Sequence, residues 1–130
     1  MSAICLCDVI EWLNKRKKYC ENESTMLSSK IDWNYDSTTM TIEENDDLMD
    51  EYEISEKEWL GCYILLRAFG TRNHMIPYEG NVDDYIEYLF TVNDSIITRA
   101  FKRYITEFPM YKEMKSGSLF IPIYPITLGF

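Results

Sequence analysis

Apolar and polar residues alternate at helical spacing over much of the chain, and residues 55–70 are the clearest case. Ser55 and Glu58 stand three residues apart at the start, as in a capping box where each side chain accepts from the other's backbone N–H. Gly70 supplies a left-handed stop at the end. Between these ends apolar residues fall on nearly every side of the helix. We therefore expect residues 55–70 to form a central helix that is buried all round.

The N-terminal segment also has helical spacing. Apolar residues recur every three or four positions from about Ile4 to Tyr19, and the basic cluster 15–18 closes the segment. A helix C-terminus favours cations, so we expect the helix to end there, with a phosphate-binding patch as the alternative interpretation of the cluster. Residues 21–29 are polar and are predicted to form a loop.

A period of two residues predicts strands between 31 and 42. From position 31 apolar residues alternate with polar ones, a turn signal follows at Asp36–Ser37, and the alternation resumes at Met40. We expect a short β-hairpin here, covered by the central helix. Residues 43–53 are predicted to be an irregular connection or a short helix.

Two more helices and a strand are expected in the second half of the chain. One helix begins at Asn81 and covers residues 82 to about 90, and the other begins at Asn93 or Asp94 and ends at Pro109. Residues 119–126 are strongly apolar but contain two prolines, which excludes a helix and favours an extended edge strand. With 130 residues, the chain is predicted to be a single domain of the α+β class, dominated by helices.

Composition places the chain among folded proteins. Apolar residues make up 46% and aromatic residues 15%, and no apolar run is long enough to cross a bilayer. The N-terminus lacks the basic start of a signal peptide, and the four cysteines form no C-x-x-C pair. We therefore expect a cytoplasmic protein with reduced structural thiols, without metal or cofactor.

The charge is very uneven. The net charge is −9, and residues 43–58 hold nine acidic residues and a single base, Lys57. Such a field attracts positively charged partners and works against direct binding of nucleic acid. The partner-binding residues predicted on this basis are acids interleaved with tyrosines, because tyrosine is a favoured interface anchor. They are Glu43, Glu44, Asp46, Asp47, Asp50, Glu51, Tyr52, Glu53, Tyr78, Asp83, Asp84 and Glu87.

Two constellations could carry other chemistry. Asp32, Asn34, Asp36 and Glu43 match the ligand spacing of an EF-hand calcium loop, but Ser37 stands where that loop needs glycine. We therefore expect no calcium site.

The second constellation would make the chain a small enzyme. It combines the single histidine, His74, as a general base with the carboxylates Asp83, Asp84 and Glu87. Acids in the first turn of a helix are normally favoured by its dipole, so we expect structural roles for them.

In its small size, its acidic balance and its lack of a catalytic motif, the chain resembles the immunity proteins of bacterial toxin systems, of the contact-dependent inhibition or colicin type. The resemblance is one of overall profile and centres on the acidic run 43–58. It implies stoichiometric binding to a basic protein, such as a cationic nuclease toxin, whose cleft the acidic face would occupy. The alternative is a viral or phage protein that binds a host factor as a nucleic-acid mimic. Neither interpretation specifies the oligomeric state.

Overall fold

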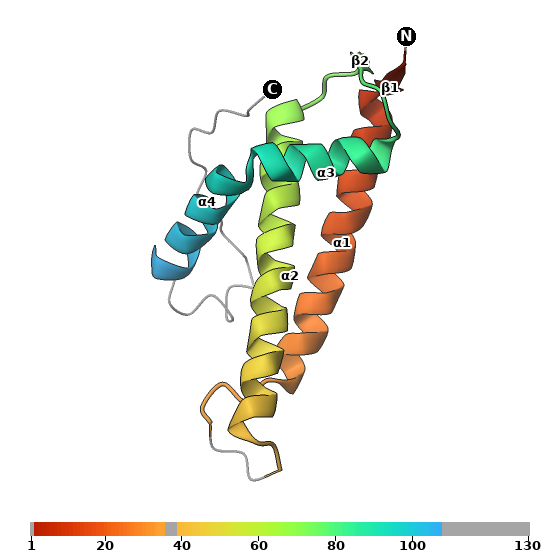
Figure 1. Cartoon of the computed structure of the whole chain (residues 1–130). Helices are drawn as coiled ribbons and strands as arrows, with labels where there is room; N and C mark the ends of the chain where they lie inside the picture. Colours follow the sequence, from red (N-terminus) through yellow and green to blue (C-terminus); the bar gives the residue numbers. More distant parts are fainter. Residues whose placement is uncertain (1, 36–38, 108–130) are drawn as a thin grey trace.

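Two long antiparallel helices organise the fold. A computed structural model describes residues 2–35 and 39–107. Helices α1 (Leu6–Lys30) and α2 (Ile42–Phe69) lie side by side along their whole length (Figure 1). The shorter helices α3 (Val82–Val92) and α4 (Asp94–Glu107) pack against one half of this pair. A small antiparallel sheet completes the described chain, so the prediction of a helix-dominant α+β fold is confirmed.

Helix α1 does not end at Tyr19, and the predicted loop at 21–29 is wrong. The helix continues to Lys30 because the polar residues of this segment have partners. The hydroxyl of Ser24 donates to Ser55 of α2 at 3.1 Å, and the hydroxyl of Thr25 donates to a main-chain carbonyl within α1. Tertiary contacts thus override a weak local preference. The basic cluster 15–18 consequently lies in the middle of the helix, where it cannot complement the end of the dipole.

Helix α2 begins thirteen residues before the predicted start at Ser55. Its N-cap is Thr41, whose hydroxyl accepts from the N–H of Glu44 at 3.1 Å. Ser55 lies inside the helix, and its hydroxyl donates to the carbonyl of Cys20 at 3.1 Å. The end at Gly70 is confirmed, with a φ of 61°. Burial all round is confirmed near the middle of the segment, where residues 59–62 are all buried.

The β-hairpin predicted at 31–42 is wrong. Ile31 is buried and Trp33 packs edge-on against Tyr52, so their apolar side chains close the tip of the α1–α2 hairpin. Asn45 of α2 fixes this turn by accepting from the N–H of Asp32 at 2.8 Å and donating to its carbonyl at 2.9 Å. The apolar residues that alternate with polar ones from position 31 therefore belong to a turn, which buries its apolar side chains on one side.

The strands lie elsewhere and are very short. Strand β1 (Ala3–Cys5) pairs with β2 (Met75–Pro77), and Ile4 stands opposite Ile76 in the register. Three residues are too few to establish an alternating pattern, which explains why the sequence did not indicate this sheet. The sheet ties the start of α1 to the connection between α2 and α3.

Helices α3 and α4 lie where two helices were predicted, and they complete the core on the C-terminal half of α2. Asn81 caps α3 by accepting from the N–H of Asp84 at 2.8 Å. At the crossing of α3 and α2, Gly61 leaves no room for a side chain. A Cβ placed there would lie 2.6 Å from a ring carbon of Phe90. The missing side chain allows the two helices to approach closely.

Three remaining predictions concern the termini, the cysteines and the membrane. The helix end at Pro109 and the strand at 119–126 lie outside the described residues. Cys5 and Cys7 are joined by a disulfide, so the prediction of reduced thiols is wrong for this pair, whereas Cys20 and Cys62 are free and buried. In the described chain, no helix combines the length and apolarity that a membrane span requires.

Candidate protein-binding surface

The N-terminal half of α2 exposes a dense set of carboxylates, which we call the acidic face. Asn45, Leu48, Met49 and Tyr52 are turned inward at helical spacing, and the residues between them point to solvent. The acidic face comprises Glu43, Glu44, Asp46, Asp47, Asp50, Glu51 and Glu53, all of them exposed. They occupy about 16 Å of helix. Among the residues that the structure describes, none of these seven takes part in an ion pair.

The acidic run does not form one surface, because its later members point inward. Glu56 is buried with 1% of its surface exposed, and Glu58 is half-buried. Tyr52 was predicted as a partner-binding residue, but it is completely buried, with its ring centroid 5.4 Å from that of Trp33, so it does not lie on this surface. The aromatic side chain on this surface is instead Tyr35, whose hydroxyl donates to Asp46 at 3.3 Å.

The predicted binding residues after position 77 belong to the region around α3, and two of them have structural roles. Tyr78 packs against Tyr85 with ring centroids 5.0 Å apart. Asp84 completes the capping box of α3. Asp83 and Glu87 line a hollow between α2 and α3, so they remain candidates for binding. The predicted set is thus split between two regions.

Among the described residues, no hydrogen bond or ion pair joins His74 to Asp83, Asp84 or Glu87. His74 is exposed, and its main-chain carbonyl accepts from the N–H of Leu6 at 2.9 Å. Asp83 accepts from the indole N–H of Trp12 at 2.8 Å. In residues 2–35 and 39–107, no group of three potential ligands is arranged to hold a metal ion.

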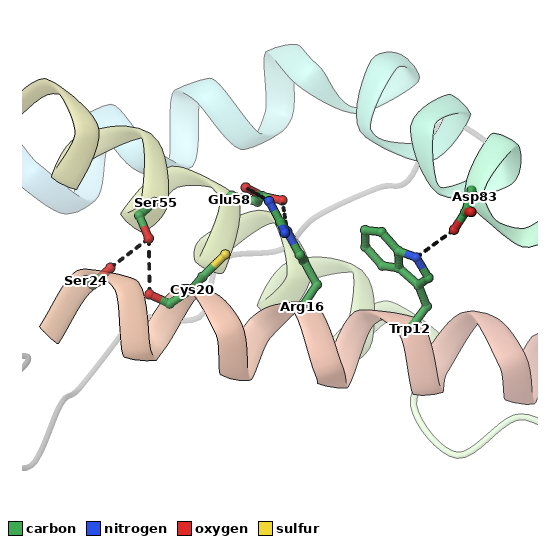
Figure 2. Close-up of polar contacts among 7 residues, drawn as sticks. All are labelled: Trp12, Arg16, Cys20, Ser24, Ser55, Glu58 and Asp83. Atoms are coloured by element: carbon green, nitrogen blue, oxygen red, sulfur yellow. Dashed lines mark hydrogen bonds and ion pairs between the residues drawn. The ribbon is translucent and has the colours of Figure 1, made fainter. Parts of the chain in front are cut away.

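A row of polar contacts along α1 fixes the framework that presents the acidic face (Figure 2). Trp12 reaches Asp83 of α3, and Arg16 forms two hydrogen bonds to Glu58 of α2, at 2.5 and 3.1 Å. Further along, Ser24 and the carbonyl of Cys20 meet the hydroxyl of Ser55. These contacts hold α1, α2 and α3 in a single register, because each needs a particular pair of helix positions.

The two free thiols beside this row are not nucleophiles at neutral pH. Burial is the larger cause, and the negative charge of Glu58, which disfavours a thiolate, is the second; together they raise the pKa of Cys20 from 9.0 to about 11. Burial likewise raises the pKa of Cys62 to about 12. Since the thiolate is the reactive form, both thiols are protonated and weakly reactive at neutral pH.

Three hollows on the described surface share one exposed apolar residue, Ile54 of α2. The largest, about 490 Å³, is bounded by α2, α3 and the start of α4, with Trp12 of α1 in its wall. Two smaller ones of about 380 and 220 Å³ adjoin it at Ile54. The sequence could have indicated that Ile54 is exposed. Tyr52 and Ile54 stand about 200° apart on a helix, so they cannot both face α1.

In comparisons with protein-family models, with curated proteins and with solved structures, nothing matches this chain. Its function is therefore argued from its own residues.

Proposed function

We propose that the chain is a stoichiometric binding protein for a basic protein, acting as an immunity protein that neutralises a cationic toxin of the nuclease type. The observation that carries the proposal is the acidic face, with seven exposed carboxylates on eleven consecutive residues of one helix. Their like charges repel one another, which costs stability. A basic partner would relieve this repulsion, and that gives the arrangement a physical reason beyond solubility.

The proposed mechanism is occlusion. Because the substrates of nucleases are polyanions, the binding clefts of these enzymes carry Lys and Arg. A helix with many exposed carboxylates has the complementary charge. Bound in or beside such a cleft, α2 would exclude RNA or DNA without doing chemistry. The summed charge would also accelerate the encounter, because electrostatic steering acts on association more than on dissociation.

The first experiment identifies the partner. The chain is purified from its native host, and the proteins retained with it are identified by mass spectrometry. We expect one basic protein at equal stoichiometry, whose nuclease activity falls as the chain is added. A basic host protein that binds nucleic acid would instead favour the host-factor alternative.

The second experiment tests the acidic face by surface plasmon resonance against that partner. Glu43→Gln/Glu44→Gln/Asp47→Asn should slow association by about tenfold, because steering depends on summed charge. Asp8→Asn/Glu11→Gln/Glu79→Gln is the matched control, since it removes three exposed charges away from the acidic face. An association rate unaffected by the first variant and by salt would leave the acidic face with a role in solubility alone.

A further inference from the structure

The α1–α2 hairpin has a groove on the side where α3 crosses it. The smallest hollow lies between the two long helices, and it shares Ile54 and Glu58 with the largest hollow, which continues to Trp12 beside α3. The third hollow meets both of them at Ile54, and we call the combined depression of all three the Ile54 groove. Along α1 it extends from Leu27 to Trp12, a span of sixteen residues or about 22 Å of helix.

The groove is apolar along its floor and acidic at its edges. Ile54, Ile86, Phe90 and Ile97 supply apolar surface. Two basic side chains line the hollows, and each is already paired with an acid that lines them too. Arg16 binds Glu58 at 2.5 Å, and Lys57 lies 3.7 Å from Asp94. The other acids that line the hollows are Glu23, Asp50, Glu51, Glu53, Asp83 and Glu87.

Ile54 is the residue that a partner would cover. It is 67% exposed and stands where all three hollows meet. Ile42 is 69% exposed on the same helix but lines none of these hollows, so exposure alone does not distinguish the two. Single exposed apolar residues are common. An isoleucine at the centre of a groove with acidic edges has the anatomy of an interface core surrounded by a polar rim.

We infer that the Ile54 groove receives an amphipathic basic helix of the partner, with an apolar side chain over Ile54 and Lys or Arg beside the six carboxylates. The inference rests on the proposed function and specifies where and how the partner binds. Two antiparallel helices present the ridges and grooves into which a third helix packs. Helix-in-groove recognition uses apolar anchors at positions i, i+3, i+4 and i+7, and about 15 residues would fill the groove.

The test uses two synthetic peptides of identical composition, about 15 residues long to match the groove. One places leucines at i, i+3, i+4 and i+7 among lysines and arginines, and the other has the same residues scrambled. Fluorescence anisotropy at near-physiological salt measures binding to the full chain. We expect the amphipathic peptide to bind at least about tenfold more tightly than the scrambled one, because only it aligns apolar anchors with the groove.

Ile54→Gln should abolish this preference, whereas Ile42→Gln, which changes an equally exposed isoleucine on α2, should leave it intact. Equal binding of both peptides, or equal effects of the two substitutions, would overturn the inference. So would failure of both peptides to bind wild type, as expected if residues 108–130 fill the groove. A change in the sedimentation of the protein alone on Ile54→Gln would assign the groove to a second copy and also overturn it.

The two proposals fail in different ways. If neutralising Glu43, Glu44 and Asp47 slows association with the native partner while Ile54→Gln has no effect on it, the acidic face binds the partner and the groove does not. If the amphipathic peptide binds as expected but no basic protein is retained from the host, the groove is a binding site while the immunity function is wrong.

Discussion

Arg16 and Glu58 join α1 to α2 through an ion pair with two hydrogen bonds. Their side chains are 38% and 30% exposed, and the guanidinium engages both carboxylate oxygens. Among the described residues, the only ion pair within α1 itself is Lys15–Glu11, whose side chains are 77% and 62% exposed. Solvent screens the second pair far more strongly, so the two should differ in energetic value.

We expect Glu58→Gln to lower the free energy of unfolding by about 1 kcal/mol, because a partly buried guanidinium loses its anionic partner. Glu11→Gln, the matched control, should change it by less than about 0.5 kcal/mol. Urea denaturation at neutral pH measures both. Equal effects would mean that partial burial adds nothing to the Arg16 pair.

The buried thiol of Cys20 gives a pH dependence with a definite sign. Its pKa is about 11 in the folded chain against an ordinary 9.0, so above pH 9 the folded state holds a proton that the unfolded state has lost. The contribution of the protonated Cys20 thiol to the free energy of unfolding is complete below about pH 9, and it is lost as the pH rises towards 11. When the pH is raised from 8.5 to 10.5, the free energy of unfolding should therefore fall less in Cys20→Ala than in wild type. Urea denaturation at the two pH values measures this difference. Parallel losses in the two proteins would contradict this assignment.

At the scale of elements, the main feature is that α2 is one continuous helix through the acidic face. Its regular backbone spaces the carboxylates, and Thr41 supplies the cap. If residues 43–53 formed an irregular connection instead, the same carboxylates would not have fixed positions relative to one another. Continuity can be tested with proline, which is tolerated at the first helical position but breaks a helix interior.

Glu53→Pro should destabilise the protein by about 3 kcal/mol or more, because it removes an interior hydrogen bond of α2 and its ring clashes with the preceding turn. Ile42→Pro occupies the first helical position, after Thr41 with an extended ψ of 159°, and should cost little. Thermal denaturation followed by circular dichroism compares the two. A mild effect of Glu53→Pro would indicate that residues 43–53 are not helical in solution.

At the scale of the whole molecule, the charge of the acidic face opposes the stability of the fold. Three pairs of its acids stand four residues apart, namely Glu43–Asp47, Asp46–Asp50 and Asp47–Glu51. Each such pair destabilises a helix by about 0.3 kcal/mol at low salt.

Raising the NaCl concentration from about 50 to 500 mM should therefore increase the free energy of unfolding by about 1 kcal/mol, since the Debye length contracts to a few ångströms. Asp47→Asn, which removes two of the three pairs, should show a smaller gain, and Asp8→Asn should behave like wild type. A fall in stability with salt would show that favourable ion pairs outweigh this repulsion.

The sequence predicted what depends on local pattern. The end of α2 at Gly70, the cap of α3 at Asn81 and the exposure of the seven carboxylates all follow from neighbouring residues. It did not predict what depends on distant partners. Residues 21–29 are helical because Ser24 and Leu27 meet α2, and Trp33 closes a turn because Tyr52 lies beneath it. The Ile54 groove needs the placement of four helices, which no single segment encodes.

The unequal covering of the long helices has a consequence for local opening. The half near Gly61 is packed by α3 and α4, whereas the described core at the other end is a small cluster around Leu27, Ile31 and Tyr52. Amide hydrogens of residues 42–50 should accordingly exchange with deuterium faster than those of residues 59–66, because opening that end disrupts fewer buried contacts. A bound partner would slow exchange most at the end that opens most easily.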